Sequence, residues 1–100
     1  MHTTLKTMEK LDKLLTEADE LITCASICDD PELKSIYMDL ARCHYDGYEK
    51  LSKAGERMVE RKTQQMPDEK AQVIREMAAW HKEKYDERAA KIKHRLDSMR

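Results

Sequence analysis

Two ten-residue stretches of the chain carry the side chains best suited to chemistry, and they share one pattern. DLARCHYDGY (residues 39–48) and EMAAWHKEKY (residues 76–85) each contain an acid, an alanine, a histidine and a tyrosine at the same spacing. Imidazole and carboxylate groups bind metal ions, and imidazole exchanges protons near neutral pH. The repeat therefore raises two alternatives: a duplicated metal site, or one way of building a helical core that is used twice.

Helix geometry separates the acid from the histidine in each stretch. Asp39 and Glu76 stand five positions before His44 and His81, and five positions correspond to about 500° of rotation, so the side chains point apart. In a hairpin of two helices the two histidines would lie about 10 Å apart along the axis, too far to share an ion. We therefore predict two histidines packed within the helices, with a pH-sensitive or metal-binding role for His44 or His81 as the alternative.

The stretch DDPELKSIYMDLARCHYDGYEKL (residues 29–51) resembles the second-helix region of ferritin-like proteins, in which a short loop leads into a helix with an acid and an E-x-x-H motif. The resemblance implies a helical bundle and, as an alternative function, a degenerate metal or cofactor binder using His44 or His81. The chain departs from the motif at its glutamate, because Ala41 precedes His44 and Ala78 precedes His81 at that spacing. The metal ligands of the family are thus not retained.

The three cysteines do not form a familiar site. An odd number without a disulfide-like framework fits a reducing compartment. Cys24 and Cys28 lie four residues apart, but Cys43 falls too far along the next predicted helix to complete a zinc site. Cys43 and His44 are adjacent, so their side chains diverge by about 100°, which disfavours a cysteine nucleophile. We predict no enzymatic activity and no cofactor.

The composition predicts the elements that position these residues. Charged residues make up 39% of the 100 residues, with only two glycines and two prolines, which favours long helices. We predict an all-α single domain over residues 1–100, with helices at about 4–27, 32–65 and 68–99. Thr3 or Thr4 caps the first helix, and Asp30-Pro31 and Pro67-Asp68 start the others. Short turns favour an antiparallel three-helix bundle, or a long helical hairpin braced by a shorter first helix.

Apolar spacing predicts the buried face of each helix. In the first helix it is formed by residues repeating every seven positions, which are Met8, Leu11, Leu15, Ala18, Ile22 and Ala25. Glu17 and Glu20 fall outside this stripe and are expected in solvent. In the second helix an unbroken three-four spacing of coiled-coil type predicts a core seam of Leu33, Tyr37, Leu40, His44, Gly47, Leu51, Ala54 and Met58. The third helix has a predicted stripe of Ile74, Met77, Ala78, His81, Tyr85, Ala89, Ile92, Leu96 and Met99.

The net charge of −1 is unevenly distributed. Residues 1–30 contain 3 basic and 7 acidic side chains (−4), residues 31–65 contain 7 and 6 (+1), and residues 66–100 contain 9 and 7 (+2). This division favours packing of the first helix beside the other two. The basic excess is small for a nucleic-acid surface, so weak nucleic-acid binding through the third helix is a second alternative function. No apolar run approaches the roughly 20 residues of a membrane span, and we predict a cytoplasmic protein.

The shorter first helix leaves the far end of the hairpin uncovered. Apolar residues of this tip are therefore the predicted partner-binding surface, formed by Met58, Val59, Met66, Val73, Ile74 and Trp80. Trp80 either packs between the second and third helices or stands exposed as a binding anchor. The predicted function is a non-enzymatic protein–protein interaction or assembly module, which we expect to form homo-oligomers.

Overall fold

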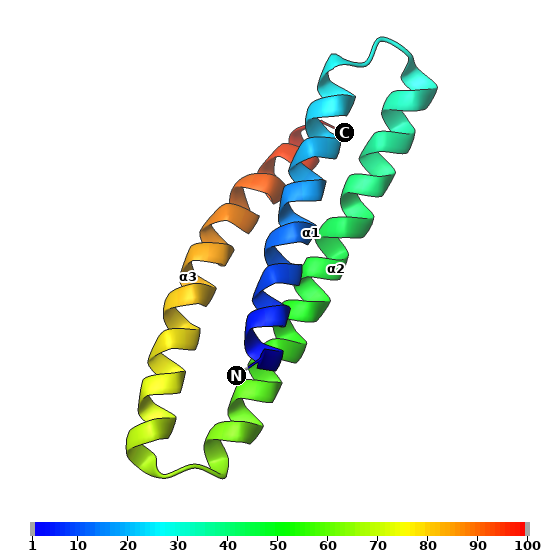
Figure 1. The fold of residues 1–100 in the computed structure, drawn as a ribbon. Helices are drawn as coiled ribbons and strands as arrows, with labels where there is room; N and C mark the ends of the chain where they lie inside the picture. Colours follow the sequence, from blue (N-terminus) through cyan, green and yellow to red (C-terminus); the bar gives the residue numbers. More distant parts are fainter. Residues whose placement is uncertain (1, 100) are drawn as a thin grey trace.

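The computed structural model describes residues 2–99, with side chains from residue 7 to residue 99. Within that range the chain forms three helices, α1 (His2–Ile27), α2 (Pro31–Gln64) and α3 (Asp68–Ser98), in a body of 57 × 19 × 15 Å (Figure 1). The chain reverses at both turns, so α1 and α3 run antiparallel to α2 and parallel to each other (Figure 1). The predicted all-α three-helix bundle is confirmed, and no helix end differs from its predicted position by more than two residues.

The start of α2 forms as its sequence predicts. The Asp30 side chain accepts a hydrogen bond of 3.0 Å from the backbone N–H of Glu32, and Pro31 occupies the first helical position. Both features favour a helix that begins there, because the cap satisfies a free N–H and proline has none to satisfy. Pro67 likewise precedes the first residue of α3. The predicted cap of α1, Thr3 or Thr4, lies outside the described side chains.

One face of α1 forms the centre of the core, as its seven-residue repeat predicts. Leu15, Ala18, Ile22 and Ala25 have no exposed surface, and Leu11 keeps 8%. Complete burial of a leucine or isoleucine side chain contributes about 1.5–3 kcal/mol. This face of α1 is therefore a main source of the stability of the bundle.

The buried face of α2 differs from the predicted seam. The buried row is Met38, Ala41, Tyr45 and Tyr48. The predicted seam is rotated away from it: its members Leu33, Leu40 and Ala54 are exposed, and the rest are half-buried. The prediction was wrong because α2 has apolar residues on two rows, and a helix with two neighbours buries the side between them.

Two arginines of α3 join it to α1. Arg88 donates hydrogen bonds of 2.6 Å to the carboxylate of Asp12 and to the hydroxyl of Thr16. Seven residues further along α3, which is about two helical turns, Arg95 pairs with Asp19 of α1. These contacts confirm the expected packing of the acidic first helix beside the basic third one. Each pair is largely exposed, so its contribution is about 0–1 kcal/mol.

The hairpin of α2 and α3 extends beyond the beginning of α1 (Figure 1). On α3, Ala89, Ile92 and Leu96 are buried as predicted, whereas Met77 is 57% exposed, contrary to its predicted place in the core stripe. The parallel register explains the error. Because Arg88 pairs with Asp12, Met77 lies level with the very start of α1, where little of that helix remains to cover it.

None of the helices formed by residues 2–99 combines the length and the apolar character that crossing a membrane requires.

Candidate interaction surfaces

The two histidines of the repeated stretches have different surroundings. The Nδ1 atom of His44 lies 3.4 Å from a carboxylate oxygen of Glu17 on α1, and its side chain is 32% exposed. Glu17 also lies 3.9 Å from the Nζ atom of Lys13. The expectation that Glu17 faces only solvent was therefore wrong, because it reaches across the junction between α1 and α2.

His81 has an aromatic neighbour in place of a carboxylate. Its ring meets the edge of the Trp80 ring with centroids 4.9 Å apart. Ala41 is buried, and Ala78 is half-buried. Among the residues that the structure describes, no three His, Cys, Asp or Glu side chains come together as a possible ion site. His44 and Glu17 form a pair without a third ligand of these types.

Tyrosines of the repeated stretches form hydrogen bonds between the helices. Tyr48 donates a hydrogen bond of 3.4 Å to the Asp86 carboxylate, and Tyr85 donates one of 3.3 Å to the backbone carbonyl of Met8. Burial, with Asp86 nearby, raises the pKa of Tyr48 to about 12. Burial together with Glu49 raises the pKa of Tyr45 to about 12. These two hydroxyls stay protonated in the folded chain well above neutral pH.

The cysteines lie apart from one another. Cys24 and Cys28 are half-buried on α1, and the Sγ atom of Cys28 lies 3.6 Å from the carbonyl oxygen of Asp30. Cys43 is exposed on α2. The three thiols are thus free, and Cys43 is the most exposed of them.

The predicted partner surface at the tip divides into half-buried and exposed members. Met58, Val59, Met66 and Ile74 are half-buried. Val73 and Trp80 are 56% and 53% exposed. Trp80 is therefore exposed and not packed between α2 and α3, while its role as a binding anchor stays a prediction.

The exposed members share one row on α3. Met77 lies between Val73 and Trp80 at helical spacing, and we call these three residues the α3 row. The Nζ atom of Lys84 lies 3.8 Å from the centre of the Trp80 ring, the geometry of a cation–π contact. Sequence reasoning placed Met77 in the core and so missed the middle of this row.

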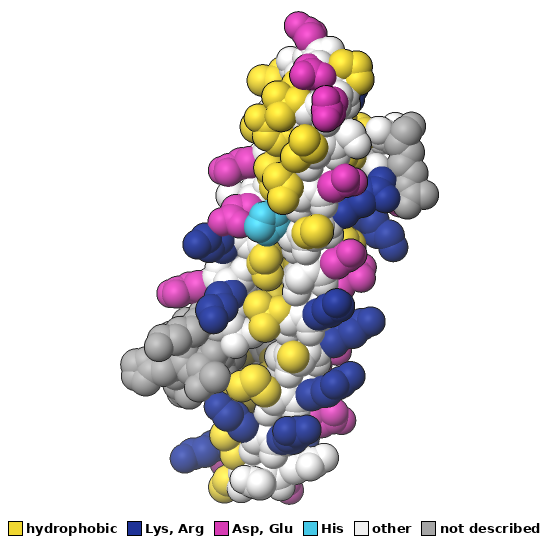
Figure 2. All heavy atoms as spheres, turned by 90° about the vertical axis from the view of Figure 1, so that its right-hand side faces the viewer, with side chains coloured by type: hydrophobic (Ala, Val, Ile, Leu, Met, Phe, Trp, Pro, Cys, Tyr) yellow, Lys and Arg dark blue, Asp and Glu magenta, His cyan; other side chains and the backbone are white. Residues whose placement is uncertain are grey.

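A second exposed apolar surface lies on α2 and was not predicted. Leu33, Ile36 and Leu40 are 41%, 49% and 45% exposed, and Ile27 at the end of α1 is 78% exposed. From Leu33, apolar residues follow one another along α2 toward the tip at helical spacing. We call the whole line the outer row, defined as Leu33, Ile36, Leu40, Gly47, Leu51, Ala54 and Met58. Figure 2 shows yellow side chains running down this face of the molecule. The signal in the sequence was the unbroken three-four spacing, which was assigned to the core.

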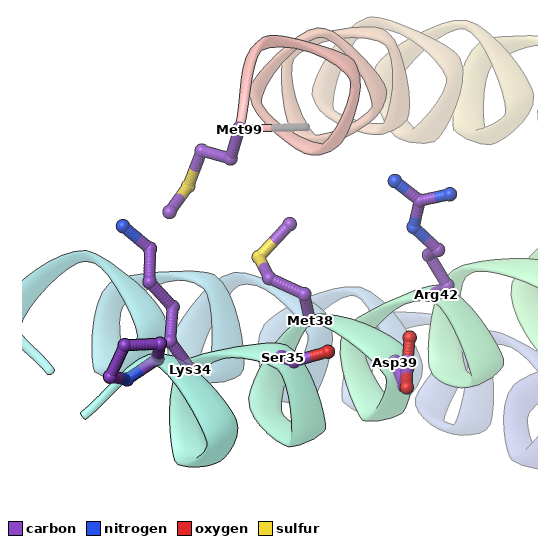
Figure 3. A pocket seen from close by; sticks show the side chains of 7 residues that line it. Lys34, Ser35, Met38, Asp39, Arg42 and Met99 are labelled. Atoms are coloured by element: carbon purple, nitrogen blue, oxygen red, sulfur yellow. The ribbon is translucent and has the colours of Figure 1, made fainter.

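Two shallow grooves lie on the surface of the described residues. The larger, of about 320 Å³, lies between the start of α2 and the end of α3 (Figure 3). Lys34 and Arg42 rise from α2 toward α3, and Met99 reaches back toward Lys34 (Figure 3). The smaller, of about 260 Å³, borders the outer row and is lined by Lys10, Lys13, Leu14, Glu17 and Leu51. Both are open at the surface, unlike the enclosed clefts that bury most of a small ligand.

Comparison with known proteins found no match to a family model, to a curated protein or to a solved structure.

Proposed function

We propose that the chain is a non-enzymatic interaction or assembly module that binds a helix of another protein along the α3 row. The observation that carries this proposal is the exposure of three large apolar side chains, Val73, Met77 and Trp80, in one line on a helix. Soluble domains rarely leave contiguous apolar surface open unless another molecule covers it.

The position of the α3 row supports a helix as the binding element. Val73, Met77, Arg88 and Arg95 fall within about 60° of rotation on α3, so Val73 and Met77 lie toward the side that faces α1. Trp80 lies about 60° beyond Met77, on the side away from Arg88. Arg88 and Arg95 hold α1 at that side through Asp12 and Asp19. A partner helix can therefore continue the line of α1 toward the tip. Its apolar face would bury the row, as in other helix-in-groove complexes.

The experiment is capture of partners from native lysate with the intact chain and two substituted chains. Met77→Asp adds a charge in the middle of the α3 row. Ala79→Asp adds the same charge at another exposed position of α3 and serves as the matched control. We expect a protein that is captured by the native chain and by Ala79→Asp and is lost with Met77→Asp. Equal capture by all three chains would contradict the proposed surface.

A further inference from the structure

The outer row is flanked by charges of opposite sign at its two ends. Along α2, the side chains beside the row are acidic toward the turn at residues 28–30, where they are Glu32, Asp39 and Asp46. Toward the tip they are basic, and are Lys50, Lys53, Arg57 and Arg61. All seven are exposed, and none forms an ion pair with another described side chain. In Figure 2 the yellow side chains have mainly magenta neighbours in the upper part and mainly dark blue ones in the lower part.

The adjoining surface of α1 repeats this division at the same level. A Cβ atom at Gly47 would lie 3.6 Å from the Leu14 side chain, so the sign change on α2 is level with Leu14. Lys10 and Lys13 lie on the tip side of Leu14, while Glu17 and Glu20 lie on the turn side. With Glu9 as the exception on α1, the face is therefore acidic at one end and basic at the other, with an apolar line through its centre.

Other charged residues of α2 lie on the side of the helix that faces α3. Glu56 forms an ion pair of 2.7 Å with Lys82. Lys34 and Arg42 line the groove near Met99 together with Asp39, which borders both this groove and the outer row (Figure 3). Glu56, Lys34 and Arg42 therefore face α3. The separation of acidic from basic side chains is a property of the surface around the outer row.

We propose that a second copy of the chain covers this face, with the two α2 helices antiparallel and a two-fold axis at Gly47. The antiparallel arrangement places the acidic half of each copy against the basic half of the other, whereas a parallel one would oppose like charges. A closed two-fold contact uses the same patch on both copies, which this pattern satisfies. The proposal rests on the proposed function only in that both describe assembly with protein, and it uses a different surface from the α3 row.

The register follows from equal distances on either side of Gly47. Leu40 then faces Ala54 of the second copy, and Ile36 faces Met58. Asp39 lies between Lys53 and Arg57 of the second copy. The seam from residue 33 to residue 58 is about 38 Å long, the length of a substantial antiparallel helix pair.

Gly47 marks the level of the two-fold axis and does not itself form the contact. A Cβ atom there would lie 3.6 Å from the Leu14 side chain, so the space beside this glycine is occupied by α1 of the same chain. The larger apolar side chains on either side of Gly47 therefore form the contact between the two copies.

The test is the molar mass of the intact chain by sedimentation equilibrium over a range of concentrations. We expect the native mass to rise from that of one 11.8 kDa chain to that of two. The variants Lys53→Glu/Arg57→Glu and Asp39→Lys/Asp46→Lys should each remain monomeric, and an equimolar mixture of the two should dimerise. Lys91→Glu/Lys93→Glu, which reverses two exposed charges on α3, should dimerise like the native chain.

A second pair of variants does not depend on charge. Leu40→Ala, in the seam, should weaken the dimer several-fold, and Val73→Ala, at an exposed position of α3, should leave it unchanged. Circular dichroism confirms that each variant remains helical.

Three outcomes would overturn the dimer. The first is a native chain that stays monomeric at every concentration. The second is a dimer that survives both charge reversals, and the third is a dimer that is lost with Met77→Asp. A monomeric chain that still captures a partner through the α3 row would leave the proposed function intact. Equal capture by all the chains beside a charge-dependent dimer would reject the partner surface alone.

Discussion

The molecule has two halves built from the same kinds of residues, and they differ in what covers them. We call the part containing α1, residues 31–55 of α2 and residues 81–98 of α3 the covered half. Residues 56–64 of α2 and 68–80 of α3 form the uncovered half. All the residues of the hydrophobic core cluster belong to the covered half. In the uncovered half the buried side chains are Thr63 and Ala71.

The helix α3 passes through both halves and shows the difference along a single element. Ile92 and Leu96 are 3% exposed, whereas Ile74 and Ala78, which lie on the same face of α3 about five turns earlier, are half-buried. The helix continues without interruption between them. A third helix therefore decides how deeply an apolar side chain of this hairpin is buried.

The largest expected effect compares two leucines. Leu15→Ala, at a fully buried position, should lower the free energy of unfolding by about 2–5 kcal/mol, because it leaves a cavity among three helices. Leu33→Ala, at a position 41% exposed in the single chain, should cost less than about 1 kcal/mol at concentrations where the chain is monomeric. Urea unfolding followed by circular dichroism measures both. Similar losses for the two variants would remove the distinction between core and outer row.

Amide hydrogen exchange compares the halves directly. Residues 58–64 and 70–78 should exchange at least about tenfold faster than residues 11–25, because few apolar contacts oppose their local opening. Mass spectrometry of peptides after timed labelling measures this. Uniform protection along α2 and α3 would show that the whole hairpin opens as one unit.

The tyrosines of α2 give the covered half a dependence on alkaline pH. The folded pKa values of Tyr45 and Tyr48, about 12, lie above the ordinary value of 10. Their contribution to stability is therefore complete below pH 10 and is lost as the pH rises from 10 to 12.

Tyr48→Phe should flatten this dependence and, at neutral pH, cost about 0.5–1.5 kcal/mol for the lost hydrogen bond to Asp86. Unfolding free energies at pH 8, 10 and 11 provide the measurement. An unchanged pH profile in Tyr48→Phe would leave Tyr45 as the group responsible.

The smallest expected effect concerns the contact between α1 and α3. Asp12→Asn should lower stability by about 0–1 kcal/mol, because the pair with Arg88 is exposed to solvent. The loss should diminish in high salt, which screens surface charges. Thermal unfolding at low and high ionic strength tests it. A large, salt-independent loss would mean that this contact holds the covered half together.

The helices were predictable because their signals are local. Pro31 and Pro67 fix where two of them begin, and the single apolar face of α1 leaves one choice of buried side. The uncovered tip was predictable from the helix lengths alone, because the first helix is shorter than the other two. Each of these properties depends on residues that are close in the sequence.

The orientation of α2 was not predictable in this way. Two rows of apolar residues on α2 have helical spacing, one from Leu33 to Met58 and the other from Met38 to Tyr48. Only the position of α3 decides that Tyr45 and Tyr48 are buried while Leu33 and Leu40 are exposed. The pairing of Glu17 with His44 depends on the same arrangement. A helix with two apolar rows thus requires knowledge of both neighbours, which periodicity alone does not provide.

The place of Trp80 has a consequence for how unfolding of this protein is observed. It is the sole indole of the chain, and it stands in the uncovered half. Fluorescence during heating will consequently describe the hairpin end, while far-ultraviolet ellipticity averages over every turn of helix. Melting curves recorded by the two signals need not coincide, and a gap between them would measure how loosely the two ends are coupled.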